Sequence, residues 1–411
     1  MKLKGKVSLP TKILIGLIIG IIVGLTFGPK ATIIEPIGTI FLRLITLVVV
    51  PLVFVSLLLG TAGVGDIKKV GRMGLKTLGY FIFTTVLAIT VGLILANVVK
   101  PGSGLSPEVQ ARIQQTTESQ SSIDLQRIQK PSTIQILVDI IPTNPLKAFA
   151  ESNMLQIIFM ALLFGTVITM IPRDKAQPVL VFLDGLNDAI IQIVHIAMKL
   201  APYGVLALIA SVTGKFGINI LFTLFKYAVT VIGGLFLYGF FWNTLAVSSF
   251  GQMNPVNFFR GVREALLIAF STSSSSATLP VAIDCLDRIG IKRQYSSFVM
   301  PLGATINMDG TALYQGVSAV FIAQLYGIPI GISGQLMIVL MATLASIGAA
   351  GVPSAGIITL VMVLKQIGVP LEGLALILGV ERLLDMCRTT VNVMGNLACS
   401  VVIQRWEKGH L

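Results

Sequence analysis

The last apolar stretch of the chain, residues 373–403, carries a row of polar side chains that is suited to binding a charged ligand. Its members are spaced by helical intervals of three or four residues, apart from one adjacent pair: Glu381, Asp385, Arg388, Thr389, Asn392 and Asn396. On a helix these positions form one stripe, and the opposite face is Leu, Ile, Met and Val. A charge at the centre of a membrane helix costs about 2.5–3.5 kcal/mol, so we expect the stripe to face the protein interior.

The residue types in this stripe favour a substrate that has one amine and two carboxylates. Asp385 can bind an ammonium group, and Arg388 offers a planar donor fork to a carboxylate. Asn392 and the serine-rich segment 271–276 could supply neutral donors to a second carboxylate. A neutral amino acid would leave Arg388 unpaired at depth. The alternative is an Asp–Arg pair that only joins helices, although the stripe extends beyond what one pair needs.

A second group of residues suggests a binding site for a monovalent cation. The segment Asn307-Met308-Asp309-Gly310 would expose carbonyl oxygens beside a carboxylate if its helix unwinds there, and hard cations such as Na⁺ prefer oxygen ligands. Thr84 and Thr85 add two hydroxyls at membrane depth, although such threonines often bond only to their own helix.

Composition shows which elements must hold these residues. The chain has 411 residues, of which 54% are hydrophobic and only 12% charged, whereas soluble domains contain about 25% charged residues. Long apolar runs predict an all-α polytopic membrane protein, because a bilayer needs about 20 apolar residues per helix. The two histidines (His195, His410) and the three scattered cysteines (Cys285, Cys387, Cys399) make a His/Cys metal site unlikely to form.

Six apolar segments precede position 250. They span about 13–27, 37–62, 78–99, 135–171 (interrupted by Pro142 and Pro145), 186–212 and 219–247. The first has no small-residue cleavage site after it, so we interpret it as a membrane helix and not as a signal peptide. The polar stretch 101–133 is typical of an exposed loop.

The net charge is +12, and the positive-inside rule is the simplest explanation of this excess of basic residues. With a cytoplasmic N-terminus and eight crossings, both termini and all four basic groups fall inside: Lys68, Lys69, Arg72 and Lys76; Arg173 and Lys175; Arg260 and Arg263; Arg405 and Lys408.

After position 250 two apolar stretches are broken in their middle. Residues 264–283 contain the serine run and Pro280, and residues 334–364 contain a Gly- and Ala-rich centre at 348–356. Each arm is too short to cross, so both stretches are predicted to be re-entrant hairpins. Each hairpin is followed by a helix with a polar cluster, and such broken-helix repeats mark a midplane site in secondary transporters.

Four motifs, in this order, closely resemble the dicarboxylate/amino acid:cation symporter family, which includes the glutamate and aspartate transporters. They are Ser274-Ser275-Ser276-Ala277-Thr278-Leu279-Pro280, Asn307-Met308-Asp309-Gly310-Thr311, Gly351-Val352-Pro353 and Asp385-Met386-Cys387-Arg388-Thr389-Thr390-Val391-Asn392. The resemblance covers essentially the whole chain and is most specific between 271 and 400.

The resemblance implies eight transmembrane helices, two re-entrant helical hairpins, inverted repeats and a homotrimer in the plasma (inner) membrane. It also implies elevator-type alternating access by a transport domain that moves against a trimeric scaffold. Residues 1–75 would hold scaffold helices 1–2, 76–133 transport helix 3 and the outside loop, 134–215 scaffold helices 4–5, and 216–411 the rest of the transport domain.

By matched position, the resemblance assigns substrate contacts to Ser274, Ser275, Ser276, Thr311, Gly351, Val352, Pro353, Ser354, Asp385, Arg388, Thr389 and Asn392. Sodium is the implied coupling ion, at three sites. The first contains Thr84, Thr85, Asn307 and Asp309, with Met308 between them; the second contains Thr305, Ser346, Ile347 and Ala349; the third contains Gly303, Asn307, Asn392 and Asn396.

Three departures from the family pattern concern the coupling ion. Asn396 replaces a usual Asp, Glu381 stands where many members have Asp, and an arginine usual in the family is absent because Ser273 and Met386 occupy its two possible places. The amide at 396 resembles proton-coupled bacterial members and makes Glu381 a candidate proton carrier.

The sequence therefore predicts symport of glutamate or aspartate with Na⁺ and possible coupling to H⁺, without a cofactor. The expected partners are the substrate, the ions, the lipid bilayer and further copies of the chain, and nucleic acid is not expected. The alternatives are a C4-dicarboxylate symporter, which Asp385 disfavours, and a purely proton-coupled glutamate transporter. An enzyme is not expected, because a serine hydrolase built on 273–276 would lack a nearby histidine base.

Overall fold

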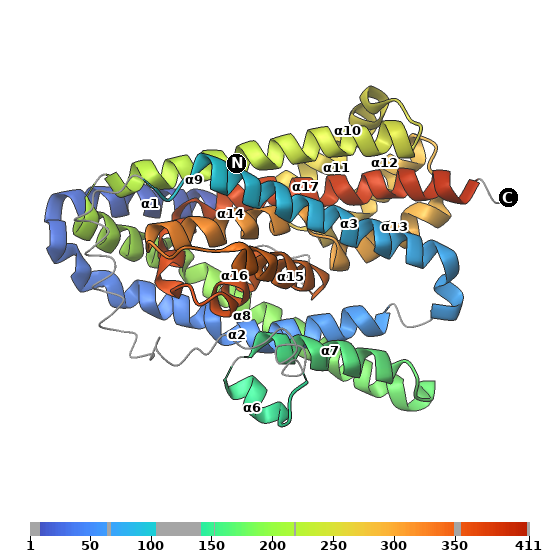
Figure 1. The fold of residues 1–411 in the computed structure, drawn as a ribbon, viewed down its shortest axis with the longest axis horizontal. Helices are drawn as coiled ribbons and strands as arrows, with labels where there is room; N and C mark the ends of the chain where they lie inside the picture. The colour runs from blue at the N-terminus through green and yellow to red at the C-terminus, as the bar shows by residue number, and fades with distance from the viewer. Residues whose placement is uncertain are drawn as a thin grey trace, which may run out of the picture.

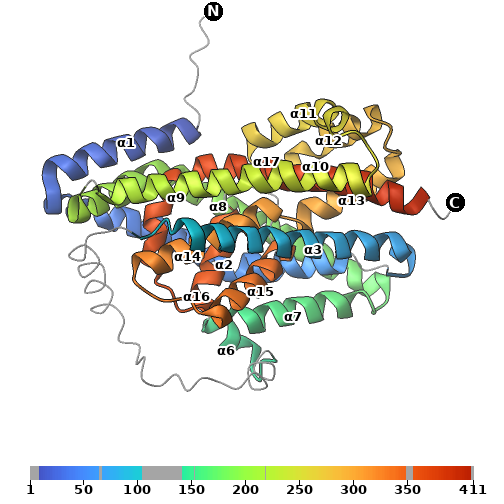
Figure 2. The ribbon, with the colours of Figure 1, turned by 45° about the horizontal axis from the view of Figure 1, so that its top comes forward.

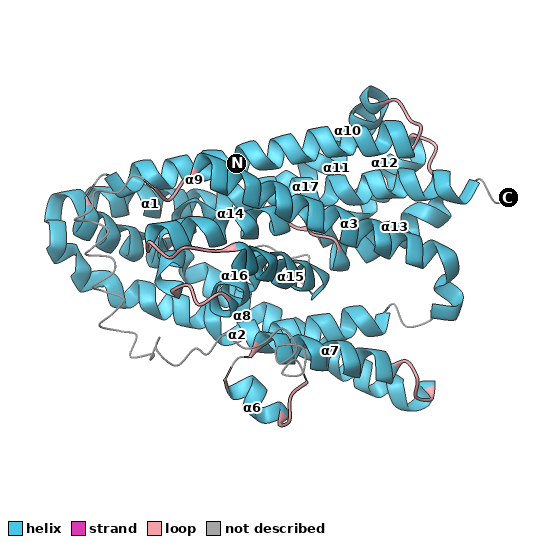
Figure 3. Ribbon diagram, in the orientation of Figure 1, coloured by secondary structure: helices cyan, strands magenta, loops and turns pink. Residues whose placement is uncertain are grey.

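A computed structural model describes residues 9–63, 67–103, 141–151, 153–217, 219–348 and 355–408. Every element in these ranges is helical, and short loops join the helices (Figure 3). Five apolar helical segments are long enough to cross a membrane: Thr11–Phe41, Met73–Val99, Arg173–Lys215, Ile220–Phe250 and Leu376–Glu407. The prediction of an all-α polytopic membrane protein is confirmed at this level.

The first helices lie at the predicted apolar segments. They are α1 (Leu9–Phe27), α2 (Glu35–Gly63), α3 (Ile67–Val99), α6 (Pro145–Ala150), α7 (Met154–Ile168) and the long α8 (Arg173–Phe216). Helices α1, α2, α3 and α8 extend beyond the predicted bounds, whereas 135–171 contains two shorter helices in its described part. Helix α8 packs against both α1 and α2, and α2 also packs against α7 (Figure 1). The contact of α1 with α8 is close because glycines face it: a Cβ added at Gly16 would lie 2.4 Å from the carbonyl oxygen of Pro202.

The next segment is helical from residue 219 to 250 but changes its winding. It begins as α9 (Asn219–Phe236), passes through a π-helical stretch at 237–242, a short α10 (Asn243–Leu245) and a second π-helical stretch at 246–250. π-helical turns often occur at functional sites, and Tyr238 in the first of them donates a hydrogen bond to Asp309.

The two broken stretches each form a pair of packed helices. Helices α11 (Pro255–Thr272) and α12 (Ser275–Arg288) are separated only by Ser273 and Ser274, and they lie side by side in Figure 2. Ser273 has a left-handed backbone (φ 53°) and Ser274 caps α12, which reverses the chain. Helices α15 (Ile332–Gly348) and α16 (Ala355–Gln366) also pack together. Their connection, residues 349–354, lies outside the described residues.

Two helices run through the interior and carry most of the predicted site. Helix α13 (Arg293–Ile306) ends at Asn307, and α14 starts two residues later, at Asp309, and runs to Leu325. Met308 interrupts the helical path (φ −129°, ψ 57°), so the predicted unwinding is confirmed. Helix α17 (Leu374–Lys408) packs against α11, α13 and α14, which brings its polar stripe to the break between α13 and α14.

Candidate functional site

The polar stripe of α17 faces the interior, as its spacing predicts. Arg388 and Asn396 are fully buried, and Glu381, Asp385, Thr389 and Asn392 are at most 5% exposed. Burial of this many polar groups is tolerable only when they are paired. The stripe divides into two clusters with different chemistry, one around Arg388 and one around Asp309.

In the Arg388 cluster, one guanidinium nitrogen serves two carboxylates. Nη2 of Arg388 donates to Oε1 of Glu381 at 2.5 Å and to Oδ1 of Asp385 at 2.7 Å. The hydroxyl of Tyr314, from α14, donates to the other Glu381 oxygen at 2.6 Å. Arg382 reaches Oδ2 of Asp385 at 3.4 Å. Two arginines thus face two carboxylates, so the cluster is balanced in charge.

Tyr314 and the second hairpin lie against the guanidinium group of Arg388. Its guanidinium carbon lies 4.1 Å from the centroid of the Tyr314 ring, a cation–π distance. A Cβ added at Gly356, the second residue of α16, would lie 2.9 Å from that carbon. The nitrogens Nε and Nη1 are buried and have no acceptor among the described residues. Arg388 therefore keeps two nitrogens free for a further acceptor, next to the second hairpin.

Asn392 fixes the start of α14 against α17. Its side-chain oxygen accepts from the backbone N–H groups of Gly310 (2.8 Å) and Thr311 (3.3 Å). Its amide nitrogen donates to Oγ1 of Thr311 at 3.2 Å. Two otherwise orphaned donors of the helix start are satisfied in this way. Thr311 and Asn392, both predicted substrate residues, therefore meet one turn from Arg388.

In the Asp309 cluster, one carboxylate is surrounded by hydroxyl groups. Asp309 is fully buried at the start of α14. Its Oδ1 accepts from Thr84 (3.2 Å) and Thr85 (3.1 Å), and its Oδ2 accepts from Tyr238 (2.9 Å). Among the described residues, no basic side chain pairs with it. The described residues therefore supply no positive charge to this carboxylate.

The amides beside Asp309 link it to the neighbouring part of α17. The side-chain oxygen of Asn307 lies 3.4 Å from the hydroxyl of Thr85, and its nitrogen donates to Oδ1 of Asn396 at 2.9 Å. Gly303 gives Asn396 its space, because a Cβ there would lie 2.4 Å from that same Oδ1. Nδ2 of Asn396 is buried without a partner in the described part of the chain. Gly303, Asn307 and Asn396 thus lie together, whereas the Asn392 side chain turns to Thr311.

The remaining predicted residues, those of the second cation site and the second hairpin, are not all brought together in the described structure. The backbone N–H of Met308 donates to the hydroxyl of buried Ser346 at 3.0 Å, which ties the α13–α14 break to the second hairpin. Thr305 is exposed and bonds to its own helix, and Ile347 is half-buried. Ala349 and Gly351, Val352, Pro353 and Ser354 lie outside the described residues.

The serines of the first hairpin form its turn. The side-chain oxygen of Ser274 accepts from the backbone N–H of Ala277 at 3.2 Å, Ser275 is buried and Ser276 is exposed. Neither Ser275 nor Ser276 hydrogen-bonds to Arg388 in the described structure. The predicted meeting of this tip with the Arg388 cluster stays a prediction.

Four residues of these clusters were not predicted from the sequence: Tyr314, Gly356, Arg382 and Tyr238. The first and third had a signal, because Tyr314 follows Thr311 by one helical turn and Arg382 precedes Asp385 by three residues. Tyr238 lies in an apolar run whose facing direction no local pattern reveals.

Comparisons with known proteins identify the family of the chain. The profile of the sodium:dicarboxylate symporter family matches residues 9–406. A proton/sodium-glutamate symport protein of Geobacillus stearothermophilus is 40% identical over 406 residues, covering 98% of this chain and 95% of the relative. A proton/glutamate-aspartate symporter of Escherichia coli is 36% identical, covering 91% and 85%. A C4-dicarboxylate transport protein of Brucella anthropi is 35% identical, covering 93% and 85%.

Proposed function

The chain belongs to the sodium:dicarboxylate symporter family, and on this premise we propose that it carries glutamate or aspartate across the membrane together with Na⁺. The observation that supports this substrate most is Arg388, whose Nε and Nη1 find no acceptor among the described residues although the side chain is fully buried beside Asp385. Relatives named as glutamate and glutamate-aspartate symporters support the same choice.

In this proposal the substrate exchanges partners with the Arg388 cluster. The side-chain carboxylate of the substrate accepts from Arg388, and the ammonium group binds Asp385, which lies one turn away. Thr311, Thr389 and Asn392 face the remaining polar atoms, and the tips of both hairpins, Ser274–Ser276 and Gly351–Ser354, close around the main-chain carboxylate. A charge-assisted hydrogen bond contributes about 1.5–3 kcal/mol, so the partner exchange can repay the desolvation of the substrate.

The cation binds at Asp309 in the same proposal. A buried, unpaired carboxylate is strongly disfavoured, and a monovalent cation or a proton is the simplest compensation. Asp309, Thr84, Thr85 and Asn307 offer oxygens that suit Na⁺. The described residues contain no cluster of three or more His, Cys, Asp or Glu, so this oxygen set differs from a multi-carboxylate cage for a divalent ion.

The two further cation sites are proposed to bind Na⁺ more weakly than in relatives that have Asp in place of Asn396. The second predicted site would use Thr305, Ser346, Ile347 and Ala349, mainly through carbonyl oxygens. The third would use Gly303, Asn307, Asn392 and Asn396. The Asn396 amide supplies no negative charge, and its Oδ1 already accepts from Asn307.

Glu381 is the proposed proton carrier. Its two oxygens bind Arg388 and Tyr314, and Asp385 is the other charged group beside it. A substrate carboxylate that takes the arginine leaves Glu381 without its counter-charge, which favours protonation. Substrate and proton would then bind together. A purely proton-coupled transporter is the second candidate, and Asn396 is the residue that favours it.

The finer architecture is part of the same proposal. We infer eight crossings, two re-entrant hairpins arranged as inverted repeats, cytoplasmic termini and a homotrimer in the plasma membrane. The division into scaffold (1–75 and 134–215) and transport parts (76–133 and 216–411) would allow elevator-type movement. The packing of α8 against α1 and α2, and of α17 against α11, α13 and α14, supports this division. Transport, with no enzymatic reaction, is the proposed activity.

Uptake of radiolabelled glutamate into proteoliposomes tests the substrate. The wild-type protein should accumulate glutamate when an inward sodium gradient is imposed, and Asp385→Ala should abolish this uptake. Asp188→Ala, a matched change on the exposed side of α8, should leave it intact. Uptake that survives in Asp385→Ala would favour the C4-dicarboxylate alternative, which the name of one relative suggests. Stronger inhibition of uptake by succinate than by aspartate would favour the same alternative.

A further inference from the structure

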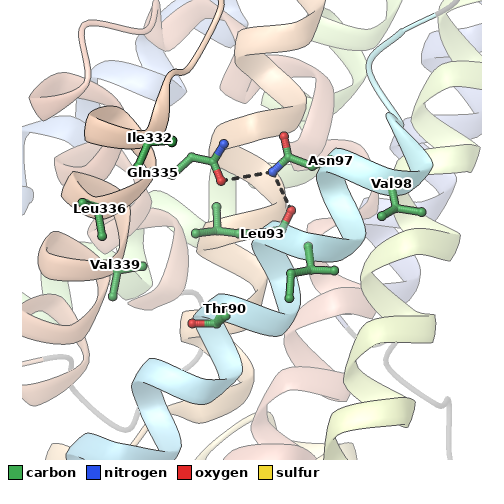
Figure 4. Close-up of a pocket in the computed structure, with 9 residues that line it drawn as sticks. Thr90, Leu93, Asn97, Val98, Ile332, Gln335, Leu336 and Val339 are labelled. Atoms are coloured by element: carbon green, nitrogen blue, oxygen red, sulfur yellow. Dashed lines mark hydrogen bonds between the residues drawn. The ribbon is translucent and has the colours of Figure 1, made fainter.

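A groove lies between the second half of α3 and the first half of α15, away from both clusters. Its volume is about 490 Å³. Figure 4 shows the two helices on either side of it, with Thr90 at the lower end and the pair Asn97–Gln335 bridging its upper part. The walls are otherwise apolar: Leu93, Ile94, Val98, Ile332, Leu336 and Val339.

The side-chain hydrogen-bond donors in the groove are already engaged. Asn97 donates to the backbone oxygen of Leu93 at 2.8 Å and to the side-chain oxygen of Gln335 at 3.2 Å. The hydroxyl of Thr90 donates to its own helix at Val86, at 2.8 Å. An occupant would therefore find few free polar partners along the walls. Such walls select a hydrocarbon chain and not a polar solute.

The groove runs lengthwise along a helix that is long and apolar enough to cross a membrane. It follows α3 from Thr90 to Val98, a length of about 12 Å at the helical rise, and the membrane-crossing segment of α3 ends at Val99. Lys100 comes directly after this end and is exposed. The apolar groove thus runs along the membrane-crossing segment of α3, and Lys100 follows its last lining residue on that helix, Val98, by two positions.

We propose that this groove binds a membrane phospholipid, with one acyl chain between α3 and α15 and its phosphate beside Lys100. The exposed mouth residues are large and apolar, with Ile332 at 80% and Leu336 at 64% exposure, which suits contact with lipid. Because α15 is one arm of the second hairpin, the bound chain braces that arm against α3. The site is independent of the substrate and cation proposals.

Photolabelling tests the acyl-chain site. Proteoliposomes of phosphatidylcholine receive a small admixture of phosphatidylcholine with a diazirine on one acyl chain, and labelled peptides are mapped by mass spectrometry. Labelling of residues 90–98 and 332–339 should exceed, several-fold, that of the exposed apolar face of α9 at Phe222 and Phe225. Labelling of the groove no stronger than that of α9 would overturn the proposal, because it would mean ordinary lipid contact.

Two matched tryptophan variants separate the groove from the general lipid surface. Leu336→Trp fills the groove and should lower its labelling several-fold. Leu237→Trp changes the same residue type at a similar exposure, 54%, on a different helix and should leave the labelling unchanged. Both positions are exposed, so neither change disturbs the core. Equal labelling of the groove in the two variants contradicts the site.

A third variant tests the phosphate contact. Lys100→Gln should reduce labelling by the phosphatidylcholine probe but not by diacylglycerol that carries the same diazirine chain, because that lipid has no phosphate. An equal fall with both probes, or no fall with either, would exclude Lys100 as the phosphate partner.

Discussion

The Arg388 and Asp309 clusters lie on the same pair of helices but balance charge in opposite ways. Arg388 is held between Glu381 and Asp385, so its charge is compensated within the protein. Asp309 accepts hydrogen bonds from the hydroxyl groups of Thr84, Thr85 and Tyr238, and no basic side chain in the described part of the chain pairs with it. On the proposed function, the first cluster exchanges one anionic partner for another, whereas the negative charge of the second is neutralised by a bound cation.

This difference is the reason for proposing separate ligands for the two clusters, and one shared residue connects them. Asn392 binds the backbone at Gly310 and Thr311, directly after Asp309, and lies one turn from Arg388 on α17. A cation that fixes Asp309 also fixes the start of α14, and hence Asn392 and the neighbouring Arg388. Substrate and cation affinity should therefore rise together.

The largest expected effect comes from Asp309→Asn. Removal of one charge from a buried pair typically costs about 3 kcal/mol or more, so sodium affinity should fall on the order of 100-fold. Sodium titration of glutamate uptake measures this change. Asp188→Asn, the same substitution on an exposed face, serves as control and should show wild-type affinity. Unchanged sodium dependence in Asp309→Asn would remove the cation from this cluster.

Arg388→Lys should lower the affinity of the Arg388 cluster for glutamate. Lysine keeps the charge but lacks the planar fork, so bonds to the substrate carboxylate are lost at about 1.5–3 kcal/mol. Glutamate affinity should fall roughly 10- to 100-fold, with a much smaller change in sodium affinity measured without substrate. Arg260→Lys, at an exposed position, is the matched control. An equal loss of both affinities in Arg388→Lys would mean that the clusters are not distinct.

Glu381→Gln should remove the pH dependence of substrate affinity while the substrate still binds. In the wild type, Arg388 stabilises ionised Glu381 until a substrate carboxylate competes for it. Proton uptake then accompanies binding, so substrate affinity should rise as pH falls, by up to about tenfold per pH unit for one linked proton. Glutamine cannot take up that proton, so the slope should vanish. Persistence of the wild-type slope in Glu381→Gln would assign the proton to another group.

The smallest predicted change, in Gly356→Ala, sharpens the geometry of the first cluster. The added methyl group would lie 2.9 Å from the guanidinium carbon of Arg388, which must shift. Overpacking of this kind costs about 1–3 kcal/mol, and we expect glutamate affinity to fall about fivefold. Gly233→Ala is the control, because no atom lies within 4 Å of a Cβ at that helical position. Equal behaviour of the two variants would argue against this contact.

The features that depend on local sequence pattern were predicted correctly: the polar stripe, the helix break and the turn of the first hairpin. The α17 stripe followed from helical spacing, and the break at Met308 followed from the motif Asn-Met-Asp-Gly, since a buried helix seldom continues through such residues. The turn of the first hairpin was expected within the serine run and lies at Ser273–Ser274. Burial of Asp385 and Arg388 followed from the cost of charge in lipid.

Contacts between distant helices were harder to predict. That both Glu381 and Asp385 bind the same nitrogen of Arg388 depends on rotamers, which spacing does not define. Tyr238 reaches Asp309 from a helix 71 residues earlier, through a π-helical stretch in an apolar run. Gly356 acts by the absence of a side chain, so its role appears only when Arg388 lies against it.

The most direct test is the binding affinity of glutamate for the purified protein, measured calorimetrically at constant pH and ionic strength as Na⁺ replaces choline. The two-cluster account predicts that affinity rises steadily with sodium in the wild type and stays low and flat in Asp309→Asn. A wild-type affinity that does not change with sodium concentration would contradict it.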